Sequence, residues 1–336
     1  MARLLLAGAT LALGACASAR TPEFPLRGAT MGSAWSVTIA GRLPAPPAVL
    51  LAGVQAQFDA VNRALSTWQP DSALSRFNEN DSGEWVDIDP ELAEVLSYGL
   101  GLAAGSDGAY DLTVGPLVNL WGFGPDPKRA DAPEAAAIEA ARARVGWSQV
   151  EVDLARHRAR KAPGVRIDLS SLGKGRGVDR VADYLDSQGV TNYLIDLSGK
   201  LRARGVNASR RPWRVAVEQP AADDPSGAPR TVPALVELRN NSIATSGDYR
   251  RYFESGGRHY SHIIDPRTGW PVAHGTLSAT AIAKTCMEAD ALATVYMVMA
   301  PDAALRLANA GRVPALWISR AGSGFRLQRS SAWPQQ

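Results

Sequence analysis

Two oxygen-bearing side chains toward the C-terminal end of the chain have the spacing of a cation site. Asp290 and Thr294 are four residues apart in the segment 287–300, where apolar residues recur at helical spacing, so both side chains project from one helix face. A carboxylate and a hydroxyl suit Mg²⁺, which takes a few protein oxygens together with phosphate and water. A structural alternative stays open, in which Thr294 bonds a backbone carbonyl and Asp290 lies near a helix start.

A glycine-rich segment, 167–177, has the composition of an anion-binding corner. The run 165–169 is strand-like and a helical pattern covers 175–188, so we expect a strand to deliver Asp168 into a loop that opens a helix. Backbone N–H groups at a helix start favour an anion, and Lys174 adds a positive charge for a phosphate. For this segment alone, a plain strand–turn–helix corner with a capping Asp168 is the simpler interpretation.

Four other segments are richer in Gly, Asp, Thr and Asn than structure alone requires, and we expect the chemistry of the protein there as well. They cover 28–33, 65–78, 109–124 and 244–269.

The N-terminus predicts export. Residues 1–3 are a short basic start, and residues 4–15 are apolar but too few to span a bilayer, as in a signal peptide. This stretch ends in Leu13-Gly14-Ala15-Cys16, which resembles a lipobox. We therefore expect a lipoprotein signal peptide over 1–15, a diacylated Cys16 and a tether over 16–26. An ordinary secretory signal with an incidental cysteine is the alternative.

The composition is that of an ordered protein with one large or two small domains. The chain has 336 residues, of which 46% are hydrophobic and 21% charged, and this argues against disorder. The 36 basic and 33 acidic residues are interspersed, so the net charge does not indicate a nucleic-acid-binding protein. The basic run 156–161 is interpreted as a solvated hairpin tip. With Cys16 lipidated, Cys286 has no partner for an internal disulfide, and two cysteines exclude a Cys-rich zinc site.

Hydrophobic periodicity predicts an α+β fold with largely antiparallel sheets packed with helices. Helices are expected at 48–66, 90–105, 133–145, 175–188 and 287–300. Strands are expected at 33–39, 149–154, 165–169, 192–197, 213–218, 234–238, 260–264, 278–283 and 315–319. The segment 219–230 is predicted to be a surface insertion. A Rossmann G-x-G-x-x-G fingerprint after a strand and a Walker loop are both missing from the sequence, which disfavours those nucleotide-binding folds.

Four segments taken together resemble the ApbE family of FAD:protein FMN transferases. They are 110–125, 168–179, 246–268 and 286–294, in family order, and the resemblance runs from about 27 to about 300. It implies an ApbE-type, T-fold-like domain over 27–336. It further implies Mg²⁺-dependent cleavage of the FAD pyrophosphate, transfer of FMN to a Thr or Ser hydroxyl of a target protein as a phosphoester, and release of AMP.

The resemblance also implies where the site residues lie. It places FAD against Met31, Trp68, Ala109, Tyr110, Asp111, Asp168, Lys174 and Ile264, and the metal against the Ser171 carbonyl, Asp290 and Thr294. The Trp68 ring offers a face for stacking.

Transfer to a hydroxyl requires a base, and His262 is the favoured candidate because imidazole titrates near neutral pH. It stands in the family motif just before Asp265-Pro266. Asp265 is the second predicted catalytic residue, and Asp248 is an alternative. A purely structural role for His262, in holding the Asp265 loop, stays open.

Two positions depart from the family pattern. Ser171 stands where Ala is common, and this is harmless if only its carbonyl binds the metal. Ser198-Gly199-Lys200 stands where many relatives read Gly-Gly-Glu, so the contact that an acid would make at position 200 is in question.

The resemblance implies partners on the exported side of a bacterial membrane. Known targets of the family belong to the sodium-pumping NADH:quinone reductase, to Rnf-type complexes and to the flavoprotein that supports nitrous oxide reduction. A lipid anchor at Cys16 on the periplasmic face agrees with such targets. Two other functions stay open: an FAD pyrophosphatase that yields FMN and AMP, and a flavin-storing lipoprotein. A Ser-His-Asp hydrolase is disfavoured because the sequence has no G-x-S-x-G elbow.

Overall fold

The computed structural model describes residues 21–125, 129, 131–219, 232–249, 251–322 and 324–335. The predicted signal peptide, Cys16 and nearly all of the predicted insertion 219–230 lie outside the described residues. No helix within the described ranges has both the length and the apolar composition needed to cross a membrane.

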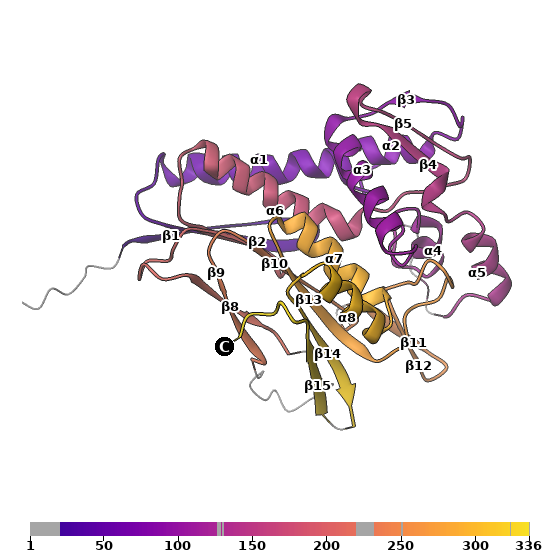
Figure 1. The fold of residues 1–336 in the computed structure, drawn as a ribbon. Helices are drawn as coiled ribbons and strands as arrows, with labels where there is room; N and C mark the ends of the chain where they lie inside the picture. The colour runs from indigo at the N-terminus through magenta and orange to yellow at the C-terminus, as the bar shows by residue number, and fades with distance from the viewer. Residues whose placement is uncertain are drawn as a thin grey trace, which may run out of the picture.

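The centre of the fold is an eight-stranded sheet in which neighbouring strands run antiparallel (Figure 1). Its strands, in spatial order, are β1 (Glu23–Thr30), β2 (Ser33–Ala40), β6 (Tyr193–Leu197), β7 (Lys200–Arg204), β10 (Ser242–Gly247), β13 (Thr276–Ala283), β14 (Ala315–Ala321) and β15 (Gly324–Arg329). The sheet and the helices against it confirm the predicted α+β class with largely antiparallel strands.

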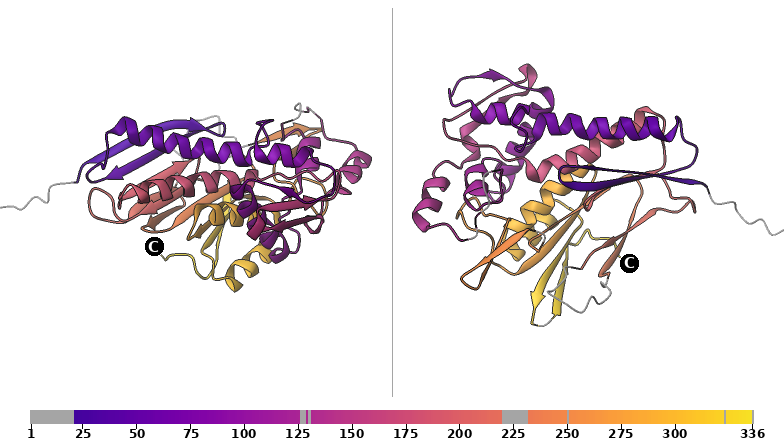
Figure 2. Two further views of the ribbon diagram at one scale, coloured as in Figure 1. Left: turned by 90° about the horizontal axis from the view of Figure 1, so that it is seen from above. Right: turned by 180° about the vertical axis from the view of Figure 1, so that it is seen from behind.

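Three helices form a layer over one face of this sheet. They are α1 (Pro47–Leu65), α6 (Ser170–Ser187) and α7 (Cys286–Val298). Figure 2 shows α1 and α6 side by side over the sheet. Helix α1 forms where it was expected because Leu50, Val54 and Phe58 recur on one face and are fully buried against the sheet.

The opposite face is covered by a two-stranded hairpin, β8 (Trp213–Val217) and β9 (Ala234–Leu238). Both strands alternate buried and exposed residues along their length. The buried set packs on apolar side chains of the main sheet and on Trp333. The period-2 pattern in the sequence therefore predicted both strands correctly.

A smaller unit lies at one end of the sheet (Figure 1). It contains α2 (Ala73–Glu79), α3 (Pro90–Gly105), α4 (Gly115–Leu120), α5 (Ala135–Arg142) and the sheet β3 (Val86–Asp87), β5 (Arg158–Lys161), β4 (Val150–Asp153). Two short 3₁₀ turns, η1 (Trp147–Gln149) and η2 (Leu154–Arg156), flank β4. The remaining elements are the hairpin β11 (Tyr252–Ser255) and β12 (Arg258–Ser261), and helix α8 (Pro301–Ala310).

The predicted strand at 165–169 is wrong. Only Arg166 pairs, in an isolated bridge with Val114. The alternation that suggested a strand has another cause, since Val165, Ile167 and Leu169 are buried in the core cluster. The Asn78 side chain replaces a neighbouring strand: its Oδ1 accepts from Ile167 N at 2.7 Å and its Nδ2 donates to Ile167 O at 2.8 Å. Asp168 therefore follows an extended segment whose backbone is hydrogen-bonded to the Asn78 side chain.

The predicted start of the next helix is also wrong. Helix α6 begins at Ser170, so the glycine-rich segment forms the first two turns of the helix and is not a loop. Its glycines serve close packing: a Cβ at Gly175 would lie 2.6 Å from the backbone oxygen of Cys286 in α7, and a Cβ at Gly177 would lie 3.0 Å from Phe58. Glycine is retained here because helices approach closely, although it weakens a helix locally.

Three further boundaries differ from the predictions. Strand β1 begins at Glu23, inside the segment 16–26 predicted to be a tether. The basic run is a hairpin, but 158–161 forms β5, in which Lys161 is buried and pairs with Asp81 at 3.2 Å. Only the turn before it matches the predicted tip. Strand β12 ends at Ser261, so His262 lies just outside it.

Candidate active site

Ten of the thirteen predicted site residues line one cavity of about 240 Å³. They are Ala109, Tyr110, Asp111, Asp168, Ser171, Lys174, His262, Ile264, Asp290 and Thr294. These residues come from the smaller unit, from the first two turns of α6 and the segment before it, from α7 and from the segment after β12. The fold thus brings together motifs that are up to 185 residues apart (Ala109 to Thr294).

A second cavity, of about 680 Å³, adjoins the first. It is lined by Met31 at the β1–β2 turn and by Trp68, whose side chain is half exposed. Ser170, Lys174 and Arg251 line both cavities. The two cavities therefore meet at two cationic side chains, an arrangement that suits a long ligand with negative charge at its centre.

The candidate cation ligands lie on facing helices. The Asp290 side chain is buried in the second turn of α7, and Thr294 follows it one turn later on the same face. Thr294 Oγ1 donates to the carbonyl oxygen of Asp290 at 3.2 Å and lies 3.3 Å from Ser246 Oγ. The structural alternative for Thr294 is thus realised, but its hydroxyl oxygen keeps lone pairs for a cation. Ser171 lies across the cavity in the first turn of α6.

These ligands form an oxygen-only set. Within the described ranges, no group of three or more His, Cys, Asp and Glu side chains has the arrangement of a metal site. One carboxylate, one hydroxyl and one backbone carbonyl match the preference of Mg²⁺, which keeps water and phosphate as its other ligands. The residues present therefore fit that ion.

Both carboxylate oxygens of Asp290 have partners within the protein. Oδ2 accepts from the Gly175 backbone N–H at 3.1 Å, and Oδ1 lies 3.0 Å from Lys200 Nζ. Burial raises the pKa of Asp290, and the Lys200 ammonium opposes that rise. The pair with Lys200 was not predicted from the sequence.

Helix α7 is held in place by a carboxylate from α6. Asp179 accepts from the backbone N–H groups of Cys286 and Met287, each at 2.8 Å, and its Oδ1 also bonds Arg202 Nη1 at 2.5 Å. A carboxylate at a helix N-terminus satisfies N–H groups that have no partner inside the helix and complements the helix dipole. Asp179 thereby fixes the position of α7 along α6, and with it the positions of Asp290 and Thr294 relative to Ser171. This role of Asp179 was not predicted from the sequence.

The close approach of α6 and α7 leads to a prediction about the free energy of unfolding. Gly175→Ala is expected to lower the free energy of unfolding by about 1–3 kcal/mol, the usual cost of overpacking, because its Cβ would meet backbone atoms of Cys286 and Met287 at 2.6 Å. Denaturant unfolding measures the effect. Gly173→Ala is the matched control, since its Cβ would meet nothing within 4 Å. An alanine there should stabilise the helix by about 0.5–1 kcal/mol, and equal effects of the two variants would contradict the packing argument.

His262 has one ring nitrogen committed to the backbone. Its Nδ1 lies 3.0 Å from the carbonyl oxygen of Arg251, and its backbone N–H donates to the same oxygen at 3.0 Å. Because a carbonyl only accepts, this bond assigns the hydrogen to Nδ1 and leaves the lone pair on Nε2. Burial lowers the pKa of His262 to about 4, so the ring is uncharged at neutral pH.

Asp265 does not line either cavity. Both of its carboxylate oxygens bond the Arg267 side chain, at 2.9 and 2.8 Å, and Oδ1 also accepts from the Arg267 backbone N–H at 2.9 Å. These contacts give Asp265 a role in holding the turn that carries Ile264 and Pro266 into the cavity. We therefore assign it no proton transfer, although it was predicted as a catalytic residue beside His262.

The other two predicted aspartates are also bound to backbone groups. Asp111 accepts from the backbone N–H groups of Thr113 and Trp147, at 2.8 and 2.9 Å, and burial raises its pKa. Asp168 Oδ1 accepts from Ser170 N at 2.7 Å, as the capping alternative anticipated. Both line the first cavity while they shape its loops.

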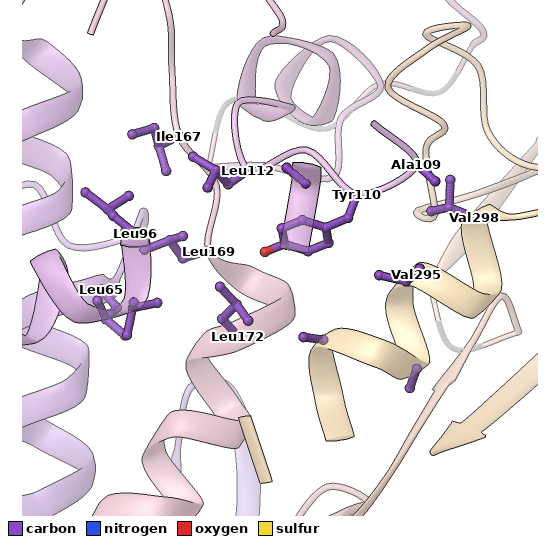
Figure 3. Close-up of a cluster of buried hydrophobic side chains, with 14 of the residues drawn as sticks. Leu65, Leu96, Ala109, Tyr110, Leu112, Ile167, Leu169, Leu172, Val295 and Val298 are labelled. Atoms are coloured by element: carbon purple, nitrogen blue, oxygen red, sulfur yellow. The ribbon is translucent and has the colours of Figure 1, made fainter. Parts of the chain in front are cut away.

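Tyr110 is enclosed by the hydrophobic core at the edge of the cavity. Figure 3 shows its ring between Leu169 and Leu172 on one side and Val295 of α7 on the other. Its hydroxyl accepts from Ser171 Oγ at 3.1 Å, and burial raises its pKa. The Ser171 hydroxyl thus gains a partner in Tyr110.

Three residues of the site were not predicted from the sequence: Arg251, Asp179 and Lys200. Arg251 lines both cavities and donates from Nη2 to the Phe123 carbonyl at 2.9 Å. Asp179 acts on Asp290 indirectly, by holding the N-terminus of α7. Lys200 contacts Asp290 directly. A signal was present for Lys200, since the family pattern implied by the resemblance has an acid at this position.

The fold is that of known flavin transferases. The structure is similar to the flavin transferase ApbE from Vibrio cholerae, with a TM-score of 0.85, 37% identity, and coverage of 93% of this chain and 98% of that one. It is similar to the apo flavinyl transferase ApbE of Pseudomonas stutzeri, with a TM-score of 0.84, 37% identity, and coverage of 93% and 96%.

The sequence comparisons agree with the structural ones. Residues 31–317 match the model of the ApbE family. A Klebsiella pneumoniae protein named FAD:protein FMN transferase is 40% identical over 334 residues, which cover 96% of this chain and 94% of the relative. A Vibrio cholerae protein of the same name is 38% identical, with coverage of 99% and 98%. The chain belongs to the ApbE family, and the resemblance seen in the sequence is confirmed.

Proposed function

We propose that this protein is a Mg²⁺-dependent FAD:protein FMN transferase that attaches FMN through a phosphoester to a Thr or Ser hydroxyl of an acceptor protein and releases AMP. Family membership and relatives that bear this name support transfer of FMN from FAD to a protein. The single observation that carries the finer proposal is the junction of the two cavities at Lys174 and Arg251, beside the oxygen ligands on α6 and α7.

A dinucleotide suits this geometry because it has two flat groups joined by a charged pyrophosphate. Each cavity would take one half of FAD, and the pyrophosphate would lie against Lys174 and Arg251. Ser171 O, Asp290 and Thr294 would hold Mg²⁺, which supplies charge neutralisation at the phosphates when it is bound. Trp68 offers its exposed ring to one of the two aromatic groups.

His262 would act as the base. Its Nε2 lone pair would take the proton of the acceptor hydroxyl as that oxygen forms a bond to the phosphorus of the FMN half. The bond from this phosphorus to the bridging oxygen breaks at the same centre, and AMP leaves with that oxygen. The bond from Nδ1 to Arg251 O keeps the ring in one orientation during the transfer.

The test is incubation of the protein with FAD, MgCl₂ and an exported acceptor domain, followed by mass analysis of the acceptor. An added FMN phosphoester on Thr or Ser, with one AMP released per FMN, is the expected result. Release of FMN and AMP without modification of the acceptor would instead support a pyrophosphatase. Bound FAD that is never cleaved would support flavin storage.

We further propose that the protein is anchored by Cys16 on the periplasmic face of the membrane. The lipobox-like sequence before Cys16 supports this location, and the acceptor would then be an exported domain of a membrane redox complex of the quinone reductase, Rnf or nitrous oxide type. An anchored enzyme would meet its acceptor on the same membrane side.

The anchor makes a prediction about fractionation. The wild-type protein is expected in the membrane fraction and Cys16→Ser in the soluble periplasmic fraction, because two acyl chains give stable anchoring. Immunoblots of the separated fractions measure the distribution. Equal soluble fractions for both forms would indicate an ordinary signal peptide.

A further inference from the structure

Lys200 is brought to the active-site cavity by a tight turn between two central strands. Strands β6 and β7 are joined at Ser198 and Gly199, which adopt φ values of 52° and 83°. Asp196 Oδ1 accepts from Gly199 N at 2.9 Å and fixes this turn. The first residue of β7 is Lys200, paired with Ala244 of β10. Its backbone is therefore held rigidly, while its long side chain extends toward α7.

The Lys200 ammonium is buried against two oxygen atoms. Its Nζ donates to the Thr245 carbonyl at 2.6 Å and lies 3.0 Å from Asp290 Oδ1. The Lys200 side chain is 11% exposed and that of Asp290 is 3% exposed. Gly175 N–H donates to Oδ2 of Asp290, so each oxygen of the only carboxylate among the predicted cation ligands already has a partner within the protein.

We propose that Lys200 is the resident counter-ion of Asp290, and that a divalent cation binds this site only by displacing the ammonium from Oδ1. The inference rests on the proposed cation site. Mg²⁺ is usually held through one or two carboxylates, and Asp290 supplies the only one among the predicted ligands. An ammonium and a divalent ion at one buried oxygen would repel each other strongly, because water screens them little there.

The chemistry of lysine permits this exchange. Its four-carbon stem is flexible and carries a point charge, so the ammonium moves without a change in the backbone. The Thr245 carbonyl remains as one partner after displacement. The displaced charge stays in the first cavity, on the side where Lys174 and Arg251 already favour phosphate groups. Lys200 is thus a positioning residue that raises the cation concentration needed to fill the site.

The test is a charge series at position 200, with Mg²⁺ alone as the probe in calorimetric titrations of the metal-free protein. Lys200→Met should bind Mg²⁺ at least about tenfold more tightly than wild type, which corresponds to about 1.4 kcal/mol. Lys200→Glu should bind it more tightly again, because it adds a carboxylate. Lys200→Arg should stay within about threefold of wild type, since it keeps the charge.

Lys284→Met is the matched control. Lys284 is exposed and lies just before α7, so this variant makes the same change in net charge without touching the site. Its Mg²⁺ affinity should equal that of wild type.

Thermal unfolding provides a second measurement if Lys200→Met is poorly stable. Without its counter-ion, Asp290 is a buried unpaired charge, so metal-free Lys200→Met should unfold at a lower temperature than wild type. Mg²⁺ should raise its melting temperature by more than it raises that of wild type, since the cation binds the folded state more tightly. An equal rise in both proteins would overturn the inference.

Asp290→Asn distinguishes a failure of the proposed cation site from a failure of the counter-ion role of Lys200. If Asp290→Asn binds Mg²⁺ as well as wild type, the proposed cation site is wrong and the counter-ion role fails with it. If Asp290→Asn loses binding while Lys200→Met matches wild type or binds more weakly, the cation site stands and only the counter-ion role is overturned.

Discussion

Asp290→Ala is expected to slow FMN transfer by roughly 1,000-fold, because a bound metal supplies several kcal/mol of charge stabilisation and each 1.4 kcal/mol is a factor of ten. Asp290 is the one carboxylate among the predicted cation ligands, and it is buried where α7 faces α6. Removing it also leaves the Lys200 ammonium with the Thr245 carbonyl alone. Rates of acceptor flavinylation at saturating FAD and MgCl₂ measure the loss.

Glu288→Gln is the matched control for this prediction. It lies on the same helix but lines neither cavity, so its transfer rate should remain at the wild-type level. Circular dichroism should show that Asp290→Ala is folded. In wild type, excess chelator should stop transfer and added Mg²⁺ should restore it. Full turnover in excess chelator would remove the metal from the mechanism.

The helices that carry the site were predictable where one face of each is buried. Helix α1 follows the 3.6-residue period because its apolar face packs on the sheet, and α7 follows a long apolar run. The family resemblance predicted that ten residues of the first cavity would lie in one site. No periodicity in the chain relates Tyr110 to Asp290.

The sequence was misleading where tertiary contacts replaced local preferences. Glycines at 173, 175 and 177 are typical of a loop, yet they lie in α6 because α7 and Phe58 leave no room for side chains at two of them. The run 165–169 alternates like a strand, but the Asn78 side chain takes both backbone hydrogen bonds of Ile167. In both cases the deciding partner is distant in the chain, so no local pattern reveals it.

The packing of α6 on α7 links the stability of the fold to the geometry of the site. Asp179 caps α7 from α6, and Gly175 allows the two helices to approach until its N–H reaches Asp290. The contacts that hold the helices together are therefore the contacts that set the distance between Ser171 and Asp290. A change at this interface should alter cation binding even where it touches no ligand.

His262→Ala is expected to slow FMN transfer by about 100-fold or more, the usual scale for the loss of a general base, while FAD binding is retained. Binding should survive because the backbone N–H of residue 262 still donates to the Arg251 carbonyl, which keeps Arg251 at the junction of the cavities. Single-turnover transfer rates and quenching of flavin fluorescence measure the two properties separately.

His262→Asn separates the base from a structural role. An asparagine amide can replace the Nδ1–H bond to Arg251 O, but it has no nitrogen that accepts a proton. If His262 is the base, His262→Asn should be as slow as His262→Ala. Recovery of transfer in His262→Asn would show that the ring serves only to bond the Arg251 carbonyl.

The pH dependence of wild-type kcat/KM identifies the base independently, because it reports groups of the free enzyme. Burial lowers the pKa of His262 to about 4. A base must be deprotonated to act, so transfer should persist at mildly acidic pH and be lost only as the pH falls through about 4. The alternative base, Asp248, lies 3.9 Å from His259, and burial raises its pKa to about 6. Loss of transfer as the pH falls through about 6, unchanged in His262→Asn, would assign the proton to Asp248 and exclude His262.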